Sequence, residues 1–314
     1  MKQEVNKLLL KIGLFIIPVL CWVSIVIVVD PFNYFNISKI ISYNIKVKSA
    51  QQINSLLFNT INFKNKPTSN VIIGDSRIRK LPTKKIKKIT GEKYHIMHSN
   101  AAKLNEIIDL FWYSDSIYFA ATSKNLKNVI IGINFNLYNQ YSYANRVEEV
   151  EAMLKNKYLY FFNWSTLETV YLTLKNQFFK YNVKEKKIKK EHWEYITKTI
   201  ARNHYSKYKY PENTLKRLKE IGNYCSLKNI NLTLLIVPHH KDFHDRLIEY
   251  NLEKAELVFK NDIKDIGRVI DYDFPNSITE CTSCFNDPIH TTDSVSDLII
   301  EEILLNKFEI GNEL

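Results

Sequence analysis

The stretch VIIGDSRIRK, residues 71–80, carries the pattern that decides the fold of this chain. Three β-branched residues and a glycine, Val71 to Gly74, lead directly into Asp75 and Ser76. A short apolar run that ends in turn residues is typical of a strand buried on both faces of a parallel sheet. Residues that follow such a strand reach the edge of the sheet where ligands bind. The stretch therefore raises the question of whether Ser76 is a surface hydroxyl or a nucleophile.

Four further apolar runs have the same character, and longer amphipathic segments separate them. The strand candidates are Asn70–Gly74, Tyr94–Met97, Asn128–Ile133, Asn231–Val237 and Arg268–Tyr272. The helix candidates are residues 46–60, Asn105–Ser123, Asn213–Leu227, Asp242–Phe259 and Thr292–Leu305. Strands that alternate with helices predict a mostly parallel sheet covered by helices on both faces. We expect a three-layer α/β/α sandwich with a five-stranded parallel sheet.

The region of about residues 138–210 interrupts this alternation. It is rich in aromatic residues and lysines, and it predicts a mostly helical insertion. Two interpretations stay open: the insertion is a lid or polymer-contacting surface, or its aromatic side chains pack against the main domain.

The N-terminus contains eighteen consecutive uncharged residues, Ile12 to Val29, which as a helix would span about 27 Å. Asp30 and Pro31 end the run without a signal-peptide cleavage site. We therefore expect an uncleaved signal anchor at residues 1–30, a connector at 31–67 and the main domain at 68–314. Lysines on both sides of the run do not decide its orientation.

The composition places few limits on function. Of the 314 residues, 45% are hydrophobic and 25% charged, which is typical of a globular protein. The net charge of +11 favours anionic partners such as lipid headgroups or an acidic polymer. The lysines accompany no nucleic-acid-binding motif, so we expect no nucleic-acid partner.

Polar residues that suit nucleophilic catalysis follow the expected strands. A serine hydroxyl needs an adjacent imidazole to accept its proton, and the imidazole needs a carboxylate to orient it. Asp287 and His290, three residues apart, can meet in a turn and leave one ring nitrogen for Ser76. In isolation, Asp287 could equally be a helix cap and His290 a surface residue. The convergence of the three groups on one edge of the sheet favours a catalytic triad.

Three short motifs resemble those of the SGNH (GDSL-type) hydrolase superfamily. They are GDSR at 74–77, GIN at 132–134 and DPIH at 287–290, in the order that the family shows. The resemblance implies a flavodoxin-like SGNH fold that needs no cofactor. It also implies that Ser76 is the nucleophile and that the Asn134 side chain helps to bind the oxyanion.

Further motifs resemble a membrane-anchored subgroup that modifies cell-envelope polymers. VDPF at 29–32, IVPHH at 236–240 and FNDPIHTTDSVSDLIIEEI at 285–303 are similar to segments of alginate O-acetylation and teichoic-acid D-alanylation proteins. The resemblance implies an esterase or O-acyltransferase that acts on acetyl esters of an envelope polysaccharide. It also implies an extracytoplasmic, single-pass protein with a membrane-bound O-acyltransferase as its partner. The alternative is a catalytically inactive protein of the same fold that binds polymer or that partner.

The chain departs from the family pattern at the oxyanion hole. Phe135 follows Asn134 where the family has aspartate, and the glycine of the second block has no clear counterpart. Ala101 or Asn100 takes its place, because a backbone donor does not require glycine. We expect oxyanion donors from Ser76, Ala101 and Asn134.

The remaining candidate residues are assigned as substrate contacts, a disulfide or structural groups. We expect Asp75, Arg77 and His239 to line the substrate groove, although solvent-facing salt bridges are an equal alternative for Arg77. Cys281 and Cys284 form CTSC and are expected to be a disulfide or a dithiol in an oxidising compartment. The spacing of His240 and His244 would suit a metal ion on a helix, but the glutamate of an HExxH motif is absent, because Lys241 follows His240, and we expect no metal. His98 is expected to cap the second strand.

Overall fold

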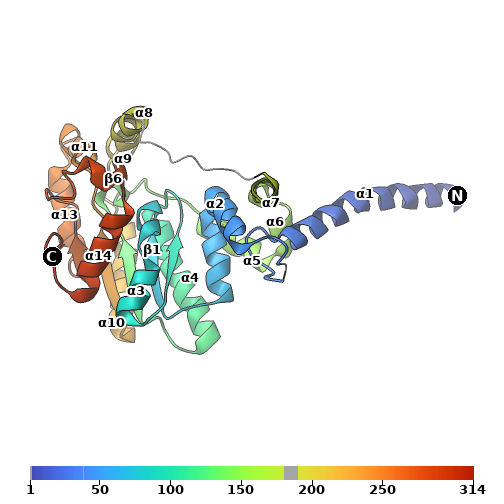
Figure 1. Ribbon diagram of the computed structural model, residues 1–314, viewed down its shortest axis with the longest axis horizontal. Helices are drawn as coiled ribbons and strands as arrows, with labels where there is room; N and C mark the ends of the chain where they lie inside the picture. Colours follow the sequence, from blue (N-terminus) through green and yellow to red (C-terminus); the bar gives the residue numbers. More distant parts are fainter. Residues whose placement is uncertain (1, 38, 180–189) are drawn as a thin grey trace. The chain divides into compact units, whose positions relative to one another are not determined.

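The computed structural model describes residues 2–37, 39–179 and 190–314 (Figure 1). Its contacts divide the chain into two compact units. Unit 1 comprises Met1–Asn62 and Glu148–Val183, and unit 2 comprises Phe63–Val147 and Lys184–Leu314. The region expected as one insertion therefore contributes to both units.

Unit 1 consists of helices in its described part. They are α1 (Lys2–Val29), α2 (Tyr43–Asn65, whose last residues belong to unit 2), α5 (Arg146–Lys155), α6 (Lys157–Phe161) and α7 (Trp164–Phe178). Within the described residues, α1 is the one helix that is long and apolar enough to cross a membrane.

Asp30 ends α1 and organises the connector that follows. Its backbone is left-handed, with φ at 46°, and its carboxylate accepts hydrogen bonds from the backbone N–H groups of Phe35 (3.2 Å) and Asn36 (2.9 Å). Lys46 of α2 forms a buried ion pair with the same carboxylate at 3.8 Å. The connector is thereby turned so that Tyr34 stacks on the buried ring of Tyr160 in α6, at 4.4 Å between ring centroids.

Unit 2 is an α/β domain built around a six-stranded sheet of order β2-β1-β3-β4-β5-β8. The strands are β1 (Asn70–Gly74), β2 (Tyr94–His98), β3 (Asn128–Gly132), β4 (Asn231–Ile236), β5 (Arg268–Asp271) and β8 (Asn312–Glu313). The first five are parallel, and β8 is antiparallel to β5. The expectation of a mostly parallel sheet is confirmed, but the sheet has six strands where five were expected.

Helices connect these strands, and a small hairpin carries the last motif. The helices are α3 (Thr83–Thr90), α4 (Leu104–Thr122), α8 (Lys190–Glu194), α9 (Ala201–Tyr205), α10 (Glu212–Lys228), α11 (Lys241–His244), α12 (Arg246–Glu249), α13 (Glu253–Ile263) and α14 (Asp293–Leu305). The short helical turns are η1 (Ser76–Lys80), η2 (Phe135–Leu137), η4 (Thr282–Cys284) and η3 (Tyr195–Ile200), of which η3 is π-helical. The hairpin pairs β6 (Phe285–Asp287) with β7 (His290–Thr291).

The continuous helix expected at Asp242–Phe259 is wrong. The segment forms α11, α12 and the start of α13, with breaks at Asp245 and at residues 250–252. Asn251 adopts a left-handed backbone with φ at 53°, which a continuing α-helix does not permit.

Both faces of the sheet are covered. Ile72 of β1 and Ile130 of β3 belong to a buried cluster with Ile86 of α3 and Ile299 of α14, so these two helices cover one face. The alternate residues of the same strands, such as Val71, are also fully buried, as in a sheet with helices on both sides. The apolar runs in the sequence reflect this double burial.

Two glycines allow the first helical turn to close against the sheet. The side chain of Ile78 in η1 lies where Gly74 and Gly132 lack a Cβ atom; a Cβ on Gly74 would lie 2.9 Å from Ile78 Cγ1. The glycines of GDSR and GIN therefore let η1 pack across the ends of β1 and β3. This packing fixes the position of Ser76, the first residue of η1.

Candidate active site

The candidate site lies at the carboxyl edge of the parallel strands, where open α/β sheets bind ligands. Ser76 follows β1 directly, because Asp75 ends the strand as the N-cap residue of η1 and accepts a hydrogen bond from the backbone N–H of Arg77 at 2.9 Å. The β6–β7 hairpin brings Asp287 and His290 to η1 from a position more than two hundred residues later in the chain.

Ser76, His290 and Asp287 form a continuous chain of hydrogen bonds. The Oγ atom of Ser76 lies 2.8 Å from Nε2 of His290. Nδ1 of His290 lies 2.9 and 2.8 Å from the two carboxylate oxygens of Asp287. Because a carboxylate only accepts, Nδ1 carries the proton, and Nε2 is left to accept the proton of Ser76. The three groups therefore have the geometry that nucleophilic catalysis by serine requires.

The hairpin turn holds Asp287 in its ionised form. Burial alone would raise the pKa of Asp287, but the hydrogen bond and charge of His290 and a backbone N–H donor at Ile289 lower it below its usual value. The backbone N–H groups of Ile289 and His290 both lie 3.1 Å from Oδ1 of Asp287. The carboxylate is thus both the acceptor for the imidazole and the cap of its own turn.

Asp75, Arg77 and His239 form a buried network. Arg77 donates through Nε and Nη2 to Asp75 at 2.8–3.0 Å and through Nη1 to Asn136 at 2.9 Å. Nε2 of His239 accepts from Nη1 of Arg77 at 2.6 Å, and its Nδ1 donates to Asp273 at 2.8 Å. Burial lowers the pKa of His239, which keeps the ring neutral in this role. The polar groups of these three residues bind one another, and their expected role as substrate contacts stays a prediction.

Asn134 does not point its amide at the site. Its Nδ2 atom donates to the carbonyl of Val237 at 2.6 Å and to Asp273 at 3.3 Å, and its Oδ1 accepts from the backbone N–H of Val237 at 3.3 Å. Both amide hydrogens are therefore used inside the protein, and the side chain is fully buried. In this structure the amide links the residues that follow β3 and β4, and the expected oxyanion role of Asn134 stays a prediction.

Ala101 has the backbone conformation that glycine would favour. Its φ is 51°, in the left-handed region, three residues after the end of β2. Glycine adopts this conformation without the strain that a Cβ introduces. The expected oxyanion donor at Ala101 stays a prediction.

The loop at Ala101 is held by an arginine that the sequence did not single out. Arg146 donates to the carbonyls of Asn100 (3.0 Å) and Ala101 (3.2 Å). The same guanidinium forms two hydrogen bonds, at 2.7 and 2.6 Å, with the fully buried carboxylate of Glu106. Glu106 also accepts from the backbone N–H of Lys103 at the start of α4. Forty residues separate Arg146 from Glu106, and no local pattern could have paired them.

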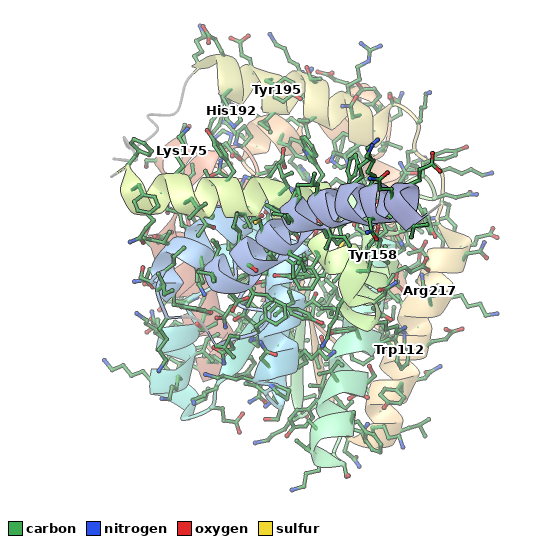
Figure 2. The ribbon with its side chains drawn as sticks, turned by 90° about the vertical axis from the view of Figure 1, so that its right-hand side faces the viewer. Trp112, Tyr158, Lys175, His192, Tyr195 and Arg217 are labelled. Carbon is green, nitrogen blue, oxygen red and sulfur yellow. A yellow bond between two sulfur atoms is a disulfide. The ribbon has the colours of Figure 1, made fainter. Side chains whose placement is uncertain are left out.

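A second imidazole lies at the outer side of Asp287. Nε2 of His192 in α8 is 3.7 Å from Oδ2 of Asp287, and half of its side chain is exposed (Figure 2). Its neighbour Trp193 donates to Asp242 at 2.9 Å and packs edge-on against His240. The final part of the expected insertion therefore reaches the candidate site within unit 2.

Cys281 and Cys284 form a disulfide immediately before the hairpin. The bridge closes η4, and the carbonyl of Cys284 accepts from the backbone N–H of Thr292 at 2.9 Å. The disulfide thus braces the segment that carries Asp287.

The other histidines of the region have structural partners. Nε2 of His240 lies 3.2 Å from Thr282 Oγ1, and Nε2 of His244 lies 3.0 Å from Glu256. No cluster of three potential metal ligands occurs among the described residues. Burial, with the nearby charge of Arg79, lowers the pKa of His98 to about 4, so the ring at the end of β2 is neutral.

A cavity of about 190 Å³ lies beside this region, lined by His239, His244, Asp273 and Phe274 among others. Neither Ser76 nor His290 lines it. The cavity is therefore not the space in which the serine could meet a substrate.

Comparisons with known proteins add no assignment. No protein-family model matches the chain, and no curated protein matches it. The function is therefore inferred from the geometry of the site and from the motifs.

Proposed function

We propose that this protein is an SGNH-type serine esterase or O-acyltransferase that acts on acetyl esters of a cell-envelope polysaccharide. The observation that carries the proposal is the hydrogen-bonded chain from Ser76 through His290 to Asp287. The polysaccharide substrate comes from the resemblance to envelope-modifying proteins and is an analogy.

In the proposed reaction, Oγ of Ser76 attacks the ester carbonyl while Nε2 of His290 takes the hydroxyl proton. The C–O bond to the leaving sugar breaks, and the imidazolium returns the proton to that oxygen. The acyl-enzyme is then attacked by water or by another sugar hydroxyl, whose proton passes to His290. The bond between the acyl carbon and Oγ of Ser76 breaks, and the imidazolium returns the proton to Oγ. Asp287 stabilises the imidazolium in both halves of the reaction.

The negative oxygen of the tetrahedral intermediate needs hydrogen-bond donors. We assign this role to the backbone N–H groups of Ser76 and Ala101. Because Asn134 is occupied by Val237, this hole has fewer donors than the family pattern implies. Loss of one donor costs about a hundredfold to a thousandfold in kcat, so we expect slow turnover.

The proposed location is the cell membrane. The length and apolar character of α1 support a single span, with the site on the extracytoplasmic side. The Cys281–Cys284 disulfide is compatible with that side, because disulfides persist in oxidising compartments. A membrane-bound O-acyltransferase is the proposed partner that would deliver the acyl group.

The experiment compares the full-length protein with Ser76→Ala and His290→Ala on a small chromogenic acetyl ester. Ser294→Ala is the matched control, since Ser294 is exposed and lies four residues after His290 without touching the triad. The proposal expects activity in the wild type and control and its loss in both triad variants. Equal background rates in all four proteins would refute it. Hydrolysis and transfer are then separated by measuring free acetate against acetate bound to an added oligosaccharide.

The internal bonding of Asn134 favours one second candidate. A protein of this fold that lacks an effective oxyanion hole could bind polymer or an acyltransferase without catalysis. In that case the wild type and the Ser76→Ala variant would bind acetylated oligosaccharide equally well, and neither would turn it over.

A further inference from the structure

Helix α7 of unit 1 exposes an aromatic face. Trp164, Leu167, Tyr171 and Phe178 have exposed fractions of 70, 43, 64 and 75%. Their spacings of three, four and seven residues place them on one side of an α-helix. The exposed side of α7 is therefore mostly aromatic, and it also carries Lys175, whose Nζ lies 6.0 Å from the ring centroid of Tyr171, and Glu168, which accepts from the Trp164 indole at 2.8 Å.

The opposite side of α7 is buried and carries hydroxyl groups. Thr166, Thr169 and Thr173 are fully buried there with Val170. Thr166 donates to the carbonyl of Tyr160 at 2.7 Å, and Thr169 donates to the carbonyl of Ser165 at 2.6 Å. A helix at a water-exposed surface turns its apolar side to the core and its polar side to water. In α7 the hydroxyl-bearing side is buried and the aromatic side is exposed. A large exposed apolar patch of this kind marks a contact with a partner or a membrane.

The start of this helical segment is tied to α1. The indole nitrogen of Trp22 donates to the carbonyl of Phe161, at the end of α6, at 2.8 Å, and Phe161 stacks on Phe35 of the connector. Trp22 lies inside the apolar run that ends at Val29. Seven residues of helix correspond to about 10 Å, so α6 meets α1 about 10 Å before the end of the apolar run.

Helix α7 is inclined to α1. In Figure 1 α7 is viewed nearly along its axis while α1 extends to the side, and in Figure 2 both helices extend across the view, so the two cross obliquely. Tyr158 and Phe162 beside α7 are also exposed, with ring centroids 4.9 Å apart. Aromatic side chains are enriched at the boundary between headgroups and acyl chains.

We propose that the aromatic face of α6 and α7 lies in the headgroup–acyl boundary of the bilayer that α1 spans. The face is defined by Tyr158, Phe162, Trp164, Leu167, Tyr171 and Phe178. Its occupant is lipid, because the segment is joined to the spanning helix at Trp22 and reaches the membrane surface with it. Exposed lysines on the same helices, Lys157 and Lys175, suit anionic headgroups. This inference rests on the proposed membrane span of α1, and it is independent of catalysis.

The test uses the full-length protein in vesicles of equimolar phosphatidylcholine and phosphatidylglycerol whose acyl chains carry bromine, which quenches tryptophan on contact. One lipid carries bromine near the ester end of the chain, and the other near its middle. The chain contains four tryptophans, so the signal of Trp164 is taken as the difference between wild type and Trp164→Phe. We expect the lipid brominated near the ester end to quench that signal. Trp112→Phe is the control, because Trp112 belongs to α4 of unit 2 and its removal should leave the lipid-quenched component unchanged (Figure 2).

A second variant, Leu167→Asp with Tyr171→Asp, places charges on the aromatic face, where both side chains are exposed. It should retain the melting temperature in detergent and lose the quenching of Trp164 by lipid. Quenching of Trp164 by aqueous iodide but not by lipid would overturn the inference. Shielding from both quenchers would also overturn it, because a protein partner or a second copy would then cover the face. If Trp22 escapes the mid-chain bromine, the membrane span itself fails, and this outcome is distinguishable from failure at Trp164.

Discussion

Replacing Arg146 by alanine should remove the side chain that holds the candidate oxyanion loop, at Asn100 and Ala101, against Glu106 of α4. The guanidinium holds the carbonyls of Asn100 and Ala101 and pairs with Glu106, a carboxylate with no solvent exposure. The two lost hydrogen bonds to the carbonyls cost about 1 kcal/mol each. The buried carboxylate of Glu106 keeps only the backbone donor of Lys103, and this adds to the cost. Because Arg146 is itself 38% exposed, water replaces part of the lost contact, and we expect a total of about 2–3 kcal/mol.

Catalysis should suffer more than stability. If the loop moves and its N–H leaves the oxyanion, kcat on a small acetyl ester should fall about tenfold to a thousandfold with little change in KM, since the interaction acts on the transition state. Arg146→Lys should restore only part of the rate, because an ammonium cannot bind a carboxylate and two carbonyls in the same fork geometry.

The chain provides a matched control in Arg217. Its side chain is also 38% exposed, and it pairs at 2.5 Å with Asp109 on α4, without contact to either loop carbonyl (Figure 2). Arg217→Ala should cost no more than about 1 kcal/mol and leave kcat unchanged. Thermal unfolding and steady-state kinetics of both variants decide the matter. Equal kcat values for Arg146→Ala and Arg217→Ala would refute the reasoning.

Three further predictions concern single groups in unit 2. Ala101→Gly should retain activity and raise the free energy of unfolding by up to about 1 kcal/mol, measured by urea denaturation, because glycine adopts φ of 51° without strain. Burial disfavours the charged form of His244, but its hydrogen bond with Glu256 outweighs this and raises the pKa to about 9. The stability contributed by His244 should therefore be complete below about pH 6.5 and be lost as the pH rises through about 9, and His244→Gln should remove this slope from unfolding curves. Cys281→Ser with Cys284→Ser should cost about 2 kcal/mol, the loop-closure entropy of so short a ring, and lower kcat by loosening the hairpin; an unchanged melting temperature would contradict it.

The strands and the hydrogen bonds that join Ser76, His290 and Asp287 could be predicted because their signals are local. Double burial makes each strand a short apolar run, so β1 was expected at its observed bounds. Asp287 and His290 are three residues apart, and a turn is enough to join them. That Ser76 would meet His290 followed from the rule that parallel strands present their following residues at one edge.

The remaining features depend on contacts between distant residues. β8 has two residues without an apolar pattern and pairs only because the end of the chain returns to β5. Asn134 occupies the expected place after β3, but the direction of its side chain is set by Val237, 103 residues later. Arg77 was expected as a substrate contact or a solvent-facing salt bridge, yet its guanidinium is buried against His239 and Asp75. For Asn134 and Arg77 the sequence position was predictable and the orientation of the side chain was not.

The division of unit 1 between two stretches of chain affects how the protein is made. During synthesis the ribosome must translate Phe63–Val147 before the second half of the unit appears, which takes about 4–17 s at about 5–20 residues per second. Throughout that interval Tyr34 has been made but its stacking partner Tyr160 has not. We expect the nascent N-terminal half to lack the contacts that bury these rings during this interval, so slowing translation between the two halves should increase its degradation.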